Sequence, residues 1–76
     1  MLMQEIRKYE AKSRGEKRRL WLAEGQKGRS NKCYTVCEHG EDGRLISESK
    51  KFDSIEKAVE YINRNFNQVR ELDRIK

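Results

Sequence analysis

The chain has 76 residues, a formal net charge of +5, and 41% charged against 34% hydrophobic residues. This length allows one small domain with a small core, and no apolar run approaches the ~20 residues that cross a bilayer, which argues against a membrane protein. All of the excess charge lies in residues 1–38, which hold ten Lys/Arg and five Asp/Glu, whereas residues 39–76 hold eight of each. A concentrated basic region is typical of nucleic-acid binders, although net charge also serves solubility.

Two cysteines and one histidine limit the chemistry that the chain offers. On a strand, Cys33 and Cys37 would lie roughly 13 Å apart at ~3.3 Å per residue, which is too far for a disulfide. Free thiols and the lack of a secretory leader predict a cytoplasmic protein. Cys33, Cys37 and His39 would share one strand face, but structural zinc normally has four ligands, so we expect no metal site. We also expect no cofactor and no small-molecule substrate. A lone histidine without a paired nucleophile predicts a protein that is not an enzyme.

The first element is predicted to be a helix over residues 2–14 that ends near Gly15. Its apolar residues recur at helical spacing with charged residues between them. They are Leu2, Ile6 and Tyr9. Residues 16–24 have two interpretations: they could prolong this helix, or their alternating leucines could form a strand over about 19–24. We favour the strand.

A β-hairpin is the clearest local pattern. Two β-compatible segments, over about 32–39 and 44–52, flank Gly40-Glu41-Asp42-Gly43, and Asp-Gly is a strong hairpin signal. The return strand alternates poorly, which leaves its register open. The glycine-containing basic stretch 25–32 that precedes the hairpin is predicted to be a loop, which could cradle phosphate or act as a plain solvated linker.

The strongest helix is predicted over residues 53–66. Asp53 and Glu56 have the spacing of a capping box. Ile55, Ala58, Val59, Ile62 and Phe66 form an apolar stripe. That stripe could also continue to residue 75 through Val69, Leu72 and Ile75. The predicted fold is therefore a single α+β domain of the order α-β-β-β-α, with a three-stranded antiparallel sheet packed on the C-terminal helix.

This order of elements resembles the double-stranded-RNA-binding domain. A more local resemblance is to the Trp-Gly-Arg domain of DNA-repair and regulatory proteins, although the Trp-Gly-Arg tripeptide is absent. The residues similar to that domain are Arg18-Arg19-Leu20, Glu24-Gly25, Ser30-Asn31-Lys32-Cys33-Tyr34, and Phe52-Asp53-Ser54 before Ala58. Small sheet-plus-helix modules also occur in the arm-binding domains of tyrosine integrases and in phage-encoded inhibitors. These resemblances imply a module that binds a macromolecule.

The expected binding site is a phosphate-binding face on the basic half of the chain. Its cations are Lys17, Arg18, Arg19, Lys27, Arg29 and Lys32, with Trp21 or Tyr34 as a stacking group. Basic side chains hold phosphates while an aromatic ring packs on a sugar or base. The expected partner is DNA or RNA. Two alternatives remain open: Trp21 could be the main core aromatic, and the module could instead bind protein through a sheet edge or helix face, as an inhibitor, a regulatory subunit or a self-associating chain.

Overall fold

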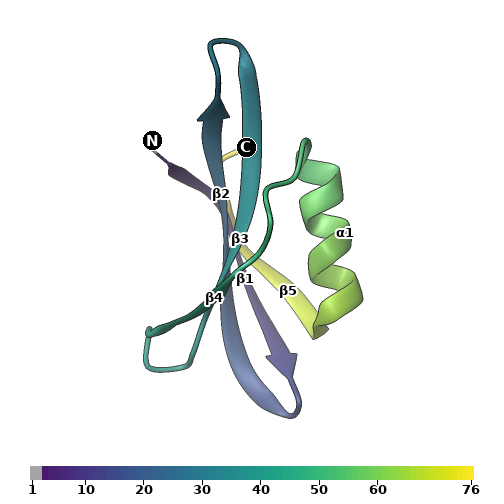
Figure 1. Cartoon of the computed structure of the whole chain (residues 1–76). Helices are drawn as coiled ribbons and strands as arrows, with labels where there is room; N and C mark the ends of the chain where they lie inside the picture. Colours follow the sequence, from purple (N-terminus) through teal and green to yellow (C-terminus); the bar gives the residue numbers. More distant parts are fainter. Residues whose placement is uncertain (1–2) are drawn as a thin grey trace.

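The computed structural model describes residues 3–76 and, among these, every side chain except that of Lys27. In chain order the elements are β1 (Gln4–Ser13), β2 (Glu16–Lys27), β3 (Asn31–His39), β4 (Leu45–Glu48), α1 (Ile55–Asn65) and β5 (Asn67–Arg74). The strands form one antiparallel sheet in the order β4-β3-β2-β1-β5. The helix α1 lies against one face of this twisted sheet and connects its two edge strands (Figure 1). Within the described residues, no helix is long and apolar enough to cross a membrane.

The predicted α-β-β-β-α order with a three-stranded sheet is wrong, and the first error is at the start of the chain. Most of the predicted helix over residues 2–14 is strand β1, and Leu2 lies outside the described residues. The register of β1 against β2 shifts between Glu5 and Arg7. A bulge of this kind adds one residue to a strand, so buried Ile6 and Tyr9 follow at a spacing of three rather than two. That spacing imitates a turn of helix.

The second error is at the other end, where the last helix does not continue to residue 75. α1 ends at Asn65, and Phe66 has an extended backbone with φ of −130°. The Phe66 N–H still donates to the carbonyl of Ile62, which closes the last turn. The chain then enters β5, which pairs with β1 as the fifth strand of the sheet.

The middle strands are present with different lengths from those predicted. β2 and β3 extend beyond 19–24 and 32–39, so most of the predicted loop over 25–32 is strand. β4 is shorter than the predicted 44–52, because regular pairing stops at Glu48. Phe52 then returns to β3 and exchanges backbone hydrogen bonds with Tyr34, at 2.9 and 2.7 Å.

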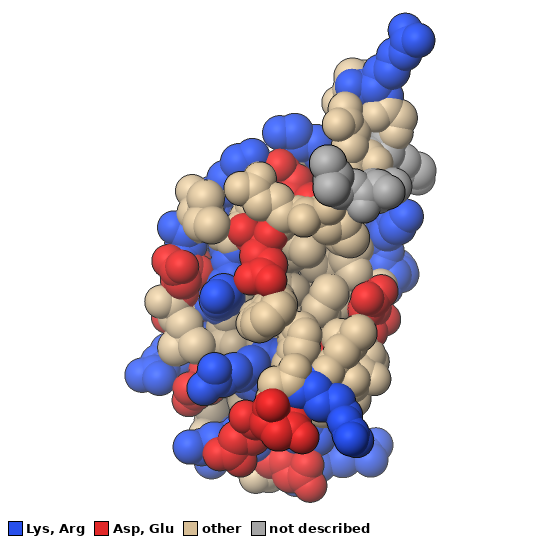
Figure 2. All heavy atoms as spheres, turned by 90° about the vertical axis from the view of Figure 1, so that its left-hand side faces the viewer, with Lys and Arg blue, Asp and Glu red and all other residues tan. Residues whose placement is uncertain are grey.

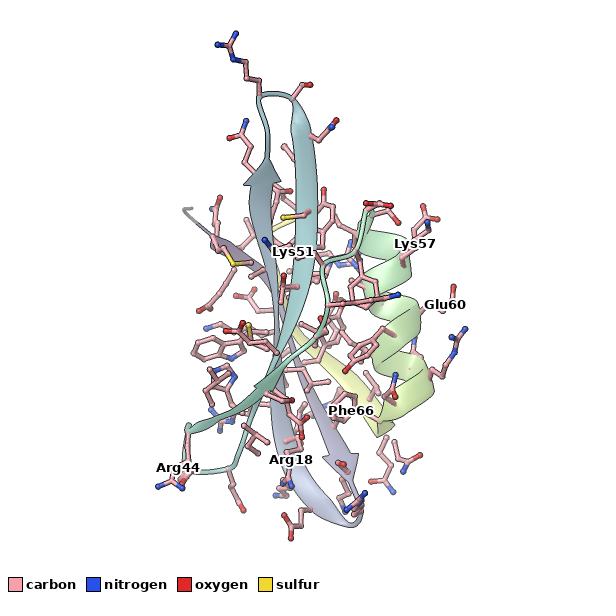
Figure 3. All side chains as sticks on the ribbon, viewed as in Figure 1. Arg18, Arg44, Lys51, Lys57, Glu60 and Phe66 are labelled. Carbon is pink, nitrogen blue, oxygen red and sulfur yellow. The ribbon has the colours of Figure 1, made fainter. Side chains whose placement is uncertain are left out.

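The helix predicted over 53–66 is present, but its cap differs by one residue. Ser54, not Asp53, is the N-cap, and its Oγ accepts a hydrogen bond of 3.1 Å from the Lys57 N–H. The capping box with Glu56 was therefore wrong. Lys57 and Glu60 lie on the outer side of the helix, away from the sheet (Figure 3).

The core lies between α1 and one face of the sheet. It is formed by Ile6, Tyr9, Ala11, Leu20, Leu22, Val36, Phe52, Ala58, Ile62 and Phe66. The alternation of strand side chains sends the intervening residues to the opposite face, which α1 does not cover (Figure 1). We call this second surface the open face.

Candidate nucleic-acid interface

The central strand β2 divides its side chains between the two faces. Leu20 and Leu22 are fully buried in the core under α1. Because successive strand residues point to opposite sides, Lys17, Arg19 and Trp21 lie together on the open face. The predicted neighbours Lys17 and Arg19 are thus brought onto one surface with Trp21.

The register of β1 against β2 adds two more lysines to this surface. Lys12 pairs with Lys17, and Lys8 pairs with Trp21. Among the described residues, no acidic group lies within ion-pair distance of Lys12, Lys17 or Arg19. Like charges placed directly opposite each other on neighbouring strands destabilise a sheet. We call Lys12, Lys17 and Arg19 the cationic cluster. Arg19 has Glu10 opposite it on β1, and Glu10 binds Arg70, so the uncompensated positive charge of the cluster is greatest at the facing pair Lys12 and Lys17.

Trp21 is partly exposed beside this cluster and does not belong to the core. Its ring lies 4.2 Å from the ring of His39, centroid to centroid, with a tilt of 37°. The Lys8 ammonium lies 5.4 Å from the indole centroid, within cation–π range. The alternative that Trp21 is the main core aromatic is therefore incorrect, since the core under α1 is formed without it.

The open face as a whole has mixed charge. Basic and acidic groups are interspersed on it rather than separated (Figure 2). One of its acids is engaged, because Glu10 pairs with Arg70 at 3.5 Å. Burial, reinforced by the nearby Glu48 and Glu5 carboxylates, raises the pKa of the Cys37 thiol on this face. A raised pKa leaves Cys37 mostly as the unreactive thiol.

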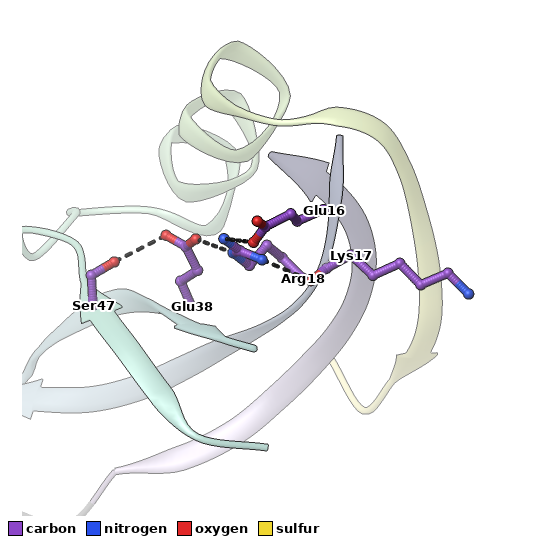
Figure 4. A network of polar contacts seen from close by, with 5 residues as sticks. All are labelled: Glu16, Lys17, Arg18, Glu38 and Ser47. Atoms are coloured by element: carbon purple, nitrogen blue, oxygen red, sulfur yellow. Dashed lines mark hydrogen bonds and ion pairs between the residues drawn. The ribbon is translucent and has the colours of Figure 1, made fainter. Parts of the chain in front are cut away.

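Arg18 points to the other side of the sheet and is held by protein groups. Its Nε donates to Glu38 Oε2 at 3.0 Å, and one Nη donates to Glu16 Oε2 at 2.9 Å (Figure 4). Ser47 in turn donates to the second oxygen of Glu38, at 3.0 Å. The side chains of Arg18 and Glu38 are each only 17% exposed. The hydrogen bond to Glu16, followed by that to Glu38, raises the pKa of the guanidinium. Arg18 thus ties β2 to β3 and β4 and is not available to a phosphate.

The remaining predicted cations lie at the opposite end of β2. Arg29 is exposed in the turn between β2 and β3, and Lys32 lies 3.6 Å from Glu24. The side chain of Lys27 lies outside the described part of the structure. Lys17 is near the start of β2 and Arg29 follows its last residue, Lys27, so the two lie toward opposite ends of a strand that spans roughly 33 Å from residue 17 to residue 27 at ~3.3 Å per residue. The six predicted cations therefore do not form one surface.

Tyr34 also lies apart from Trp21. It packs against the core on the side of α1. Burial, followed by the nearby Glu24 carboxylate, raises the pKa of its hydroxyl. Of the two predicted stacking groups, only Trp21 is on the open face.

Sequence reasoning missed Lys8, Lys12 and Arg14, because their segment was predicted to be a helix. Arg14 is exposed in the two-residue turn between β1 and β2. The alternation of Lys8 and Lys12 with buried Tyr9 and Ala11 was the available signal. It becomes visible only when the segment is interpreted as a strand.

Cys33, Cys37 and His39 do share one face of β3, as predicted, and both cysteines are free thiols. In the chain from residue 3 onward, no group of three metal-ligating side chains lies close together. Thr35 Oγ1 and His39 Nδ1 are buried without a hydrogen-bond partner in that same part of the chain.

No family model matches the chain, and no curated protein or solved structure matches it at a significant level. The function is therefore inferred from the geometry of the sheet.

Proposed function

We propose that this protein is a small, non-enzymatic module that binds nucleic acid through the open face of its sheet. Lys12, Lys17 and Arg19 neutralise phosphates, and Trp21 packs on a sugar or base beside them. The proposal covers DNA and RNA alike, because a phosphate-dominated contact does not distinguish them. The free thiols are consistent with a cytoplasmic setting.

The observation that supports this proposal is the placement of Lys12 directly opposite Lys17, with Arg19 next along the same face. Within residues 3–76 none of the three is ion-paired, whereas Arg18, Lys32 and several other cations are. A polyanion would remove the repulsion between the two lysines and release its own counterions. Relief of this repulsion and release of the counterions therefore favour the bound state, and neither occurs without the anion.

The test is the salt dependence of binding to fluorescently labelled single-stranded and duplex DNA and RNA. A variant in which Lys12, Lys17 and Arg19 are all replaced by Gln should lose three phosphate contacts. The slope of log K against log salt should then fall by about 2 for single strands and about 3 for duplexes, at ~0.7 and ~0.9 per contact.

A matched control removes the same charge elsewhere. Lys50, Lys57 and Arg64 are exposed and lie close together beside α1, outside the open face. Their joint replacement by Gln should leave the slope nearly unchanged. If wild-type protein binds no nucleic acid at low salt, or if the control loses as much affinity as the cluster variant, the proposal is wrong.

A protein-binding module, such as an inhibitor or regulatory subunit, is the second candidate. Leu45 and Ile46 are 49% and 48% exposed on the edge strand β4, which is open to strand addition. Replacing both by Ser should abolish capture of such a partner and leave the affinity for nucleic acid intact. Loss of nucleic-acid binding in that variant would place the interface on β4 instead.

A further inference from the structure

The width of the open face restricts the form of nucleic acid that fits it. Five strands at ~4.8 Å spacing give a surface about 19 Å across, whereas the major groove of B-DNA is about 12 Å wide and the minor groove about 6 Å. The face as a whole therefore enters neither groove. A duplex lying on it presents only its phosphates and sugars, because its bases are stacked inside.

Trp21 lies in the middle of the open face, where a duplex offers no unpaired base for its ring to stack on. It is on β2, the middle strand of the sheet, so the neighbouring strands surround it on both sides. The cationic cluster lies toward the β1–β2 turn, and Lys17 and Trp21 are four residues apart, roughly 13 Å along the strand. An exposed aromatic ring beside a row of cations is the arrangement on which single-stranded bases stack while their phosphates are neutralised.

From these two observations, and resting on the proposed function, we infer that the ligand is a single strand. It lies over the middle of the open face, with its phosphates on Lys12, Lys17 and Arg19 and one unpaired base against the exposed part of the Trp21 ring. The Lys8 ammonium, already 5.4 Å from the ring centroid, lies beside that base and meets the next phosphate. A duplex of the same length binds only through the cations.

Trp21 is the sole tryptophan of the chain, so its emission reports on this position alone. Wild-type protein is titrated at low salt with a single-stranded oligothymidylate and a mixed-sequence single strand of equal length. A hairpin duplex of the mixed sequence is the third probe. The single strands should bind at least tenfold more tightly than the duplex and should quench Trp21 emission, whereas the duplex should leave the emission nearly unchanged. This measurement needs no variant.

Replacing Trp21 by Leu keeps an apolar side chain on the sheet and removes the π-face. Affinity for single strands should fall between about fivefold and about 150-fold, the range given by base–aromatic stacking. Affinity for the duplex should stay within about twofold, because its phosphate contacts with the cations are unchanged. Trp21→Phe should recover most of the lost single-strand affinity. Thermal melts establish that each variant is folded under the titration conditions.

The outcomes separate this inference from the proposed function. If no probe binds with a salt-dependent affinity, the proposed function fails, and the inference fails with it. If the duplex binds as tightly as the single strands, or if Trp21→Leu weakens both equally, nucleic-acid binding stands and the single-strand inference is refuted.

Discussion

Replacing Arg14 by Asn is expected to stabilise the protein and weaken its binding to nucleic acid. Arg14 and Gly15 have φ of 54° and 79°, so both central residues of the β1–β2 turn are left-handed, as a type I′ turn requires. An ordinary L-residue costs about 1–2 kcal/mol in this region, and Asn much less. The variant should therefore gain about 1 kcal/mol of unfolding free energy. In a domain of this size that raises Tm by about 4–8 °C.

Two further variants isolate the cause. An added Cβ at Gly15 meets no atom within 4 Å, so Gly15→Ala introduces backbone strain without a clash. It should lower stability by about 1 kcal/mol and leave binding unchanged, because no charge is altered. Arg14→Lys keeps both the strain and the charge and should match wild type in both measurements.

The assays are thermal unfolding followed by circular dichroism, and a salt titration with a labelled single strand. Removing the charge at Arg14, which lies in the turn beside Lys12 and Lys17, should lower the salt slope by about 0.7. An Arg14→Asn variant that melts at or below the wild-type temperature would refute the strain argument. An Arg14→Asn variant with an unchanged salt slope would show that the β1–β2 turn does not contact the bound nucleic acid.

Three other predictions concern the sheet, the core and acid stability. Arg18→Gln should lower Tm and leave the salt slope of nucleic-acid binding unchanged, because Arg18 binds Glu16 and Glu38. Arg19→Gln should have the opposite effects, a lower salt slope and an unchanged Tm, and thermal melts and salt titrations of the two variants check this. Ile62 is 0% exposed, so Ile62→Ala should lose about 2–5 kcal/mol in urea unfolding, and Ile62→Asp should unfold the protein; native-like melting of Ile62→Asp would contradict the packing of α1. The hydrogen bond from Lys76, aided by the charge of Lys32, lowers the pKa of Glu24 below its ordinary 4.5. The ionised Glu24 carboxylate therefore contributes its full stabilisation above pH 4.5, and this stabilisation is lost as the pH falls through the lower pKa of the folded state. Urea unfolding from about pH 6 to about pH 2 should show a smaller loss of unfolding free energy for Glu24→Gln than for wild type.

The spacing of apolar residues correctly predicted the two elements in which that spacing is uninterrupted. The unbroken alternation around Leu20 and Leu22 predicted β2, and the stripe that includes Ala58 and Ile62 predicted α1. In both segments the core spacing follows from backbone geometry alone, because neither contains a register shift in the core region. The same alternation placed Lys17, Arg19 and Trp21 on one surface as soon as the strand was accepted.

Two segments were predicted wrongly because bulges changed their spacing. In β1 the extra residue near Ile6 produces an interval of three before Tyr9. In β5 the register against β1 shifts between the partners of Lys8 and Tyr9, and Leu72 falls in that interval. Intervals of three indicate a helix when no structure is at hand, and no proline or glycine after Phe66 marked the end of α1. Tertiary pairing with β1, which the local sequence does not encode, decides that residues 67–74 are a strand.

The site was predicted only in part for the same reason. Counting cations along the chain grouped Arg18 with Arg19, whereas the pleat of the strand places them on opposite sides of the sheet. Glu38, which engages Arg18, lies twenty residues away and becomes a neighbour only through the pairing of β2 with β3.

The pairing of β5 with β1 also sets a time during protein synthesis. Lys8 on β1 pairs with Asp73 on β5, and the N–H of Ile75 donates to the carbonyl of Ile6 at 2.7 Å. A ribosome adding about 5–20 residues per second needs roughly 3–13 s to add the 65 residues that follow Lys8 up to and including Asp73. Throughout that interval the outer edge of β1 has no strand beside it, and until α1 is synthesised at residues 55–65 the apolar side chains on its inner face have no helix over them. The nascent chain therefore offers an unpaired, partly apolar β-edge for seconds, long enough for a chaperone to bind it before the sheet closes.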